Sequence, residues 1–259
     1  MSSYIGEHAE LYDLFYATKD YEYESSFVDN AIKEHGKSNG VSLLELACGT
    51  GNHAFQLEKA GYRICAIDYS PSMIARARKK AALSNSSIRF DVQDMIELSC
   101  PNERFQTVIC LFDSIGYVLT NKNIKEVFKR VNNVLDEGGL FIFEYWHGGA
   151  MIRSYEPVRI KRFKNGEYDI IRISETSIDI KEQICNVKYT IYQTRLDGTF
   201  KFMEETQRNR FFLIQEMNGI AEECGFEVIN NYSGFNATKS INEETWHVVS
   251  LVKKVASVV

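Results

Sequence analysis

Residues 41–145 alternate short apolar runs, rich in β-branched side chains, with longer segments of helical periodicity. A repeat of strand, helix and strand buries its strands on both faces, so it predicts a mainly parallel sheet with helices on each side. The sequence therefore predicts an α/β core. Its strands are expected at residues 42–46, 63–67, 87–91, 107–112 and 139–144, and its helices at residues 53–60, 71–83 and 121–135.

The flanking segments follow other patterns. Residues 8–16 and 23–35 predict two helices, and the aromatic side chains of the first indicate a helical lid over a cleft. Residues 158–212 are rich in β-formers and contain Asn165-Gly166 and Asp197-Gly198, pairs that supply the positive φ angles of tight hairpins. They predict an antiparallel sheet of three or four strands.

The core pattern resumes with a helix at residues 213–224 and strands at 226–232 and 245–253, so the antiparallel sheet is an insertion and not a tail. The expected division is a lid at residues 1–40, a core at residues 41–150 and 213–259, and an inserted sheet at residues 151–212.

Composition excludes several classes of protein. A net charge of −5 disfavours a nucleic-acid groove. No run of about 18 apolar residues predicts a membrane span, and the N-terminus does not follow the plan of a signal peptide, so a cytoplasmic location is the expectation. The six cysteines show no C-x-x-C spacing, which disfavours a zinc site or a disulfide scaffold, and no metal is expected.

Residues 43–52, with the sequence LLELACGTGN, form the most informative segment. A buried strand leads into a turn in which Gly49 and Gly51 let the backbone approach a ligand, and the N-terminal amides of a helix follow. Asp68 ends the next strand, where a carboxylate can accept both ribose hydroxyl protons, and Asp94 follows the third strand, within reach of an adenine amino group. The segment predicts a site for a nucleotide-like cofactor.

The pattern Glu45-x-Ala47-x-Gly49-x-Gly51 resembles motif I of the class I methyltransferases, and Asp68 and Asp94 resemble their ribose and adenine acids. Ala47 stands where the common pattern has its first glycine. The resemblance covers residues 43–145 and implies a Rossmann-like sheet that binds S-adenosylmethionine. The expected cofactor residues are Tyr12, Tyr21, Glu45, Ala47, Gly49, Gly51, Asp68, Tyr69, Met73, Asp94, Met95, Phe112 and Ser114.

Three alternatives stay open at this point. Gly49-x-Gly51-x-x-Ala54 also fits a nicotinamide dinucleotide site of an oxidoreductase, although Glu45 would repel a pyrophosphate and would not repel a cationic sulfonium. The two glycines also fit a plain strand-to-helix turn, and Met73 fits a core position as well as an adenine contact. A methyltransferase fold retained as a non-catalytic binding module is the third alternative.

The acceptor side is less defined, because methyl transfer from a sulfonium needs mainly alignment and, for some acceptors, removal of a proton. Residues 110–117 and 144–149 end the fourth and fifth strands, where the ligand crevice of an open α/β sheet lies. The expected catalytic residues there are His147, as a base, and Tyr117, although a structural histidine fits His147 equally. His53 is expected to pack against the loop.

The N-terminal tyrosines resemble the leading segment of small-molecule methyltransferases such as the aminosugar N-methyltransferases and glycine N-methyltransferase. In those families such tyrosines close over the methionine moiety or reach the acceptor, which implies cofactor roles for Tyr12 and Tyr21 and a place near the acceptor for Tyr16. They also fit a purely structural fastening of the lid. The resemblance implies a small-molecule acceptor and a monomer or homodimer.

The inserted sheet carries more arginine than solubility needs. Guanidinium groups suit phosphates, so an anionic acceptor such as a nucleotide-linked sugar is one hypothesis. Pairing with Glu156, Glu175, Glu204 and Glu205 on a solvated face is the other. The arginines concerned are Arg153, Arg159, Arg162, Arg172, Arg195, Arg208 and Arg210.

Overall fold

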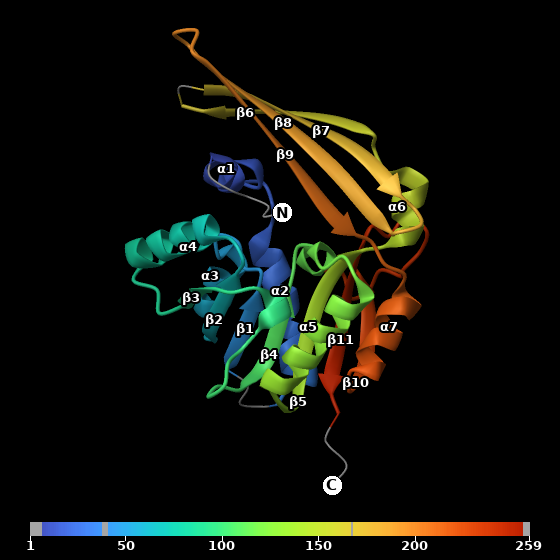
Figure 1. The fold of residues 1–259 in the computed structure, drawn as a ribbon. Helices are drawn as coiled ribbons and strands as arrows, with labels where there is room; N and C mark the ends of the chain where they lie inside the picture. The colour runs from blue at the N-terminus through green and yellow to red at the C-terminus, as the bar shows by residue number, and fades with distance from the viewer. Residues whose placement is uncertain (1–6, 38–40, 167, 256–259) are drawn as a thin grey trace.

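A mixed sheet of seven strands forms the centre of the computed structural model, which describes residues 7–37, 41–166 and 168–255. The strand order is β10-β11-β5-β4-β1-β2-β3 (Figure 1). The first five strands in sequence run parallel, and β11 runs antiparallel between β5 and β10. The strands are β1 (Ser42–Leu46), β2 (Arg63–Asp68), β3 (Arg89–Val92), β4 (Phe105–Cys110), β5 (Leu135–Trp146), β10 (Phe226–Ser233) and β11 (His247–Lys254).

Helices cover both faces of this sheet, because its strands alternate apolar side chains between the two faces. Leu43 packs in a core with α2 (Tyr21–His35), α3 (Asn52–Lys59) and α4 (Pro71–Ser84). Leu44, one residue on, packs in a second core with α5 (Asn121–Val134) and α7 (Ile214–Glu223). The five buried residues of β1 are therefore the layer that both cores share.

A second, antiparallel sheet stands over the carboxyl edge of the first (Figure 1). We call it the roof sheet; it consists of β6 (Val158–Asn165), β7 (Tyr168–Asp179), β8 (Ile184–Arg195) and β9 (Phe200–Arg210), in that order. Helix α1 (Glu7–Phe15) lies between the two sheets, where Leu11 and Phe15 pack against Ile170 and Ile191 of the roof sheet.

The architecture confirms the predicted α/β sheet with helices on both faces, an N-terminal helical segment over it and an inserted antiparallel sheet. Residues 1–6, 38–40 and 256–259, at the ends of the predicted lid and core ranges, lie outside the described residues, as does Glu167 of the first predicted hairpin turn. None of the helices in the described ranges is long and apolar enough to cross a membrane.

Two elements differ from the sequence expectation. β5 begins at Leu135, directly after α5, so it is longer than the predicted strand. Helix α6 (Gly148–Ser154) was not predicted, because a Gly-Gly pair ordinarily disfavours a helix. Gly148 is needed at this place because a Cβ on it would lie 3.0 Å from the ring of Phe211.

The roof sheet is joined to the core at a short 3₁₀ helix, η2 (Ser114–Tyr117), which follows β4. The Tyr117 hydroxyl donates to Gln207 Oε1 at 3.1 Å, and Asn209 Nδ2 donates to the Asp113 carbonyl at 3.2 Å. Gly116 makes this approach sterically possible. A Cβ there would overlap the side-chain amide of Asn209 and lie 2.8 Å from the Arg210 carbonyl oxygen.

We therefore expect Gly116→Ala to lower the free energy of unfolding by about 1–3 kcal/mol, because the new methyl group must push the roof sheet away from η2. Urea titration measures the change. Gly219→Ala in α7 is the matched control, because a Cβ there meets nothing within 4 Å. A helical Gly→Ala change in open space should stabilise by up to about 1 kcal/mol, and equal effects of the two changes would contradict the close contact.

Candidate active site

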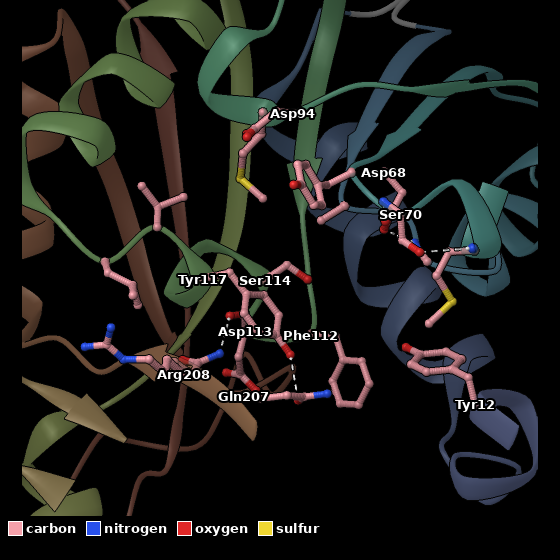
Figure 2. A pocket seen from close by; sticks show the side chains of 18 of the residues that line it. Tyr12, Asp68, Ser70, Asp94, Phe112, Asp113, Ser114, Tyr117, Gln207 and Arg208 are labelled. Atoms are coloured by element: carbon pink, nitrogen blue, oxygen red, sulfur yellow. Dashed lines mark hydrogen bonds between the residues drawn. The ribbon is translucent and has the colours of Figure 1, made fainter. Parts of the chain in front are cut away.

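A cavity of about 730 Å³ lies between the carboxyl edge of the core sheet and the roof sheet. Figure 2 shows that its side chains come from the helical segment, the core and the roof. Twelve of the predicted site residues line it: Tyr12, Tyr16, Ala47, Gly49, Asp68, Tyr69, Met73, Asp94, Met95, Phe112, Ser114 and Tyr117.

The loop after β1 has an unusual backbone. Ala47, Gly49 and Gly51 all have positive φ, at 51°, 56° and 81°. Gly51 admits no side chain, because a Cβ would lie 2.8 Å from the ring of Phe90. Ala47 adopts the left-handed conformation that the glycine of the common pattern would adopt without strain, at a cost of about 1–2 kcal/mol.

Asp68 ends β2 beside this loop and is held in place by the backbone. Its Oδ2 accepts the Gly49 N–H at 2.8 Å, and its Oδ1 accepts the Ser70 N–H at 2.7 Å. Burial nevertheless raises its pKa, against the effect of these two hydrogen bonds. Each oxygen keeps a lone pair for a further donor, which is the arrangement that two ribose hydroxyls require.

Glu45 lies in β1 behind the loop and does not line the cavity. Its side chain is buried, and Oε2 has no hydrogen-bond partner among the described residues. Burial raises its pKa to about 8, and the charge of Asp68 adds to the shift. The nearest basic group is His53, whose Nδ1 lies 3.8 Å from Glu45 Oε1 and whose Nε2 contacts Glu24 at 2.7 Å.

The turn after β3 forms the part of the cavity wall where the sequence predicts the adenine contact. Asp94 caps the 3₁₀ helix η1 (Met95–Glu97) by accepting the Ile96 N–H at 2.8 Å, and both Asp94 and Met95 line the cavity. Met73 lines it from the other side, where its buried side chain also packs with Ala9 and Tyr12. The position of Met73 is thus compatible with both predictions, a core residue and a residue of the cavity wall.

Three aromatic rings close the cavity beneath the roof sheet. The ring centroids of Tyr12 and Tyr16 lie 4.8 Å apart, and Phe112 meets Tyr16 edge-on at 4.9 Å. A Cβ built on Gly49 would meet the Tyr12 ring first, with the hydroxyl oxygen at 3.7 Å. The predicted tyrosine at the cofactor loop is therefore in contact distance of that loop.

The end of the cavity where the sequence predicts the acceptor lies between η2 and the roof sheet. Ser114 and Tyr117 face β9, which supplies Thr206, Gln207, Arg208 and Asn209 to the lining (Figure 2). Trp146 and Tyr189 complete this end. Of these β9 residues only Arg208 was singled out from the sequence, as one of the arginines that could meet an anionic acceptor. Thr206, Gln207 and Asn209 were not predicted, because a run of alternating polar residues in a strand is equally typical of a solvated face.

Four predicted site residues lie away from this cavity. Glu45 and Gly51 stand behind the loop that they shape. Tyr21 lines a separate cavity with Asp13, Asn52 and Lys80. His147 precedes α6, and its Nδ1 lies 3.1 Å from the Thr245 carbonyl oxygen, so its role as a base stays a prediction without geometric support.

A cluster at the ends of β4 and β5 was missed by the sequence analysis. His247 Nδ1 lies 2.8 Å from Glu144 Oε1 and 3.2 Å from Asp113 Oδ1, and Asp113 lines the cavity. The three residues are far apart in sequence and match no spacing motif. Only the pairing of β11 with β5 brings His247 to this place.

The arginines of the insertion divide into two groups. Arg153, Arg159 and Arg210 pair with Glu243, Glu156 and Glu216, at 3.5, 2.8 and 2.6 Å. Arg208 lines the cavity, and Arg172 is buried among the rings of Phe15, Phe163, Tyr16 and Tyr189, with no hydrogen-bond partner for Nε or Nη1 within the described part of the chain. Exposed pairing therefore holds for Arg153 and Arg159, whereas Arg210 pairs with Glu216 in a largely buried position.

The raised pKa of Glu45 makes a prediction for stability. The folded protein holds a proton that an unfolded glutamate, with a pKa of about 4.3, releases. The stability that the raised Glu45 pKa contributes is fully present below the unfolded pKa and is lost as pH rises to about 8. We therefore expect the free energy of unfolding of the wild type, relative to that of Glu45→Gln, to decrease as pH rises from about 4.3 to about 8.

Urea titrations of both proteins across that pH range measure this difference. Glu227→Gln on β10 is the control, because that side chain is exposed and its substitution should give a difference that does not change with pH. A constant difference between the wild type and Glu45→Gln would show that Glu45 is ionised in the fold.

Comparison with known proteins agrees with this geometry. Residues 43–139 match a family model described as a methyltransferase domain. YqeM of Bacillus subtilis (strain 168), which carries a provisional methyltransferase name, is 26% identical over 231 residues, covering 89% of this chain and 90% of YqeM. The dTDP-3-amino-3,6-dideoxy-alpha-D-glucopyranose N,N-dimethyltransferase of Streptomyces fradiae is 28% identical over 230 residues, covering 88% of this chain and 86% of that enzyme.

The fold has solved counterparts. The structure of an S-adenosylmethionine-dependent methyltransferase from Clostridium acetobutylicum ATCC 824 aligns with a TM-score of 0.82 and 23% identity, covering 96% of this chain and 98% of that one. The matched domain sets aside both the oxidoreductase and the plain-turn alternatives. We conclude that this chain is an S-adenosylmethionine-dependent methyltransferase with a class I core.

Proposed function

We propose that the enzyme methylates the amine of a small molecule that also carries an anionic group, of the nucleotide-linked aminosugar class. The observation that carries the proposal is the distribution of charge around the cavity. At the acceptor end of the cavity the sheet edge supplies Asp113, whereas the roof supplies Arg208. An acceptor with a cationic amine at one end and a phosphate at the other matches both sides.

Arg172 adds to this distribution from behind the wall. Its guanidinium carbon lies 5.6 Å from the ring centroid of Tyr16 and 5.4 Å from that of Tyr189, and both tyrosines line the cavity. The rings stabilise the buried cation, which keeps a positive charge behind the roof. The Streptomyces fradiae relative, named for a dTDP-linked aminosugar, supports the same acceptor class.

The cavity residues also suit S-adenosylmethionine, which supplies an activated methyl group when bound. Asp68 would hold the ribose, Asp94 the adenine edge, and the loop of Gly49 the methionine end beneath Tyr12. The unpartnered Glu45 Oε2 behind that loop would ionise more readily beside a cationic sulfonium and ammonium than beside a pyrophosphate, because an opposite charge favours the charged form of a carboxyl group.

The chain's own residues then have three tasks. Tyr16, Phe112 and Tyr12 form a shared aromatic wall that excludes water from the transfer path. Ser114, Tyr117 and Gln207 offer polar groups that orient the acceptor, so that its lone pair meets the methyl carbon in line with the sulfur. An ammonium acceptor must lose a proton first, and Asp113 is the carboxylate at this end of the cavity. A cytoplasmic location and a monomeric or homodimeric state stay predictions.

Asp68→Ala should weaken binding of S-adenosylhomocysteine by about 1–3 kcal/mol, through the loss of buried hydrogen bonds to the ribose. Isothermal titration calorimetry measures it. Asp169→Ala, an exposed change in β7, should leave the affinity unchanged. Unchanged affinity in Asp68→Ala would remove this carboxylate from the cofactor site, and binding of a reduced nicotinamide dinucleotide instead would remove the cofactor itself.

Arg208→Gln should raise the KM for a dTDP-linked aminosugar by about tenfold and leave the affinity for S-adenosylhomocysteine unchanged, because one phosphate contact is lost. Steady-state methyl transfer measures the KM. Arg159→Gln is the control, since that arginine is exposed and pairs with Glu156. A free amino sugar that reacts as well as the nucleotide-linked one would contradict the anionic acceptor.

A further inference from the structure

The turn that joins β4 to η2 is strained. Phe112 and Asp113 both have positive φ, at 58° and 55°, and neither is glycine. Each such residue costs about 1–2 kcal/mol, so the surrounding structure must hold the turn in place. The same turn sets the positions of the Phe112 ring and of Ser114 at the cavity wall.

Glu144 at the end of β5 provides one restraint. Its Oε2 accepts the Phe112 N–H at 2.6 Å, so this carboxylate is tied to the first residue of the left-handed turn. Its Oε1 contacts His247 Nδ1 at 2.8 Å. Both oxygens are therefore engaged, and the side chain is buried at 2% exposure.

Asp113 provides the second restraint from within the turn. Its side chain caps no N–H of η2; instead its Oδ1 lies 3.2 Å from the same Nδ1 of His247. Two buried carboxylates that share one nitrogen repel each other unless a cation lies between them. The charged groups that face His247 are Asp113 and Glu144, and Lys19, over the Phe112 ring at 4.3 Å, adds a positive potential at both acids.

We propose that His247 is a positioning residue for methyl transfer, because its ion pairs with Asp113 and Glu144 hold the left-handed turn and hence the acceptor wall. It acts through the turn and does not line the cavity. The proposal rests on the acceptor end assigned under the proposed function. It differs from the predicted role of His147, since His247 holds charge and transfers no proton to the acceptor.

The protonation state agrees with this role. The charge of Asp113 raises the pKa of His247 to about 11, against its burial. Burial raises the pKa of Asp113 to about 6, although His247 lowers it. Burial also acts to raise the pKa of Glu144, but hydrogen bonding and charge from His247 outweigh it and lower that pKa. The imidazolium and Glu144 therefore stay charged across the neutral range.

The first experiment needs no acceptor. Histidine side-chain NMR of the full-length protein, with His247 assigned by its loss in His247→Gln, should show an imidazolium that does not titrate between about pH 6 and pH 9. Asp113→Asn should lower the pKa of His247, because one of its two ion pairs is lost. His35→Gln on α2 is the control and should leave that pKa unchanged. A His247 signal that titrates near the ordinary value would overturn the ion pairs.

The second experiment tests positioning. In His247→Gln the two acids are left without their cation, so the backbone amide signals of residues 112–117 should shift. They should return toward wild type in Asp113→Asn/His247→Gln, where one charge is also removed. If the double variant does not restore them, His247 acts by packing alone and the proposal fails. Where His247→Gln does not fold, the Asp113→Asn titration above still decides.

Kinetics give the readout that separates positioning from cofactor binding. With a dTDP-linked aminosugar, His247→Gln should lower kcat about tenfold at about pH 8, with S-adenosylhomocysteine affinity unchanged, and this loss relative to the wild type should shrink as pH falls toward about 6 and an acid takes up a proton. An equal loss at every pH would overturn the proposal. Absence of turnover in the wild type would instead reject the acceptor class, and leave the NMR results to decide on His247.

The same three side chains have donor atoms within 4.8 Å of one another, a spacing that a divalent cation also suits. Metal analysis of the purified protein before and after chelation therefore accompanies these experiments. If the wild type holds one equivalent of a divalent metal and His247→Gln does not, the three side chains form a metal site and not ion pairs, and the proposal is overturned. Metal-free protein with unchanged NMR spectra after chelation supports the proposal.

Discussion

Each of the five parallel strands has an acidic side chain within three residues of its carboxyl end, and the cost of placing these carboxylates at one sheet edge constrains the rest of the site. They are Glu45, Asp68, Asp94, Asp113 and Glu144. A buried carboxylate is costly unless donors surround it. Here the loops provide backbone N–H groups: Gly49 and Ser70 donate to Asp68, Ile96 to Asp94, and Phe112 to Glu144.

The unusual backbone of two of these loops follows from that need. The loop after β1 places three residues at positive φ and the turn after β4 places two, and in each case a donor N–H then points toward a carboxylate of the neighbouring strand. Where glycine stands, the conformation has no steric cost; at Ala47, Phe112 and Asp113 it does. Strain at the site is thus offset by hydrogen bonds that tie adjacent strand ends together.

Features that depend on local sequence were predictable, whereas features that depend on contacts between distant residues were not. The alternation of core strands and helices, the glycine loop and Asp68 were predictable because each depends on neighbours within a short stretch of sequence, such as the apolar run before Gly49. His247, Gln207 and Asn209 were not, because contacts across about a hundred residues bring Gln207 and Asn209 to the cavity and His247 to the Glu144 carboxylate. Helix α6 was missed because the reason for Gly148 is the ring of Phe211, which no local pattern reveals.

Helix α1 connects the two halves of the cavity through three faces. Leu11 and Phe15 pack on the roof sheet, and Tyr12 packs with Met73 beside the cofactor loop. Asp13 accepts from Thr50 Oγ1 at 2.6 Å and from Lys80 Nζ at 3.1 Å, which ties the helix to that loop and to α4. A helix held by both sheets cannot move away from one without breaking contacts with the other. The position of the roof sheet over the cavity and the position of Tyr12 in the cavity wall are therefore mechanically linked.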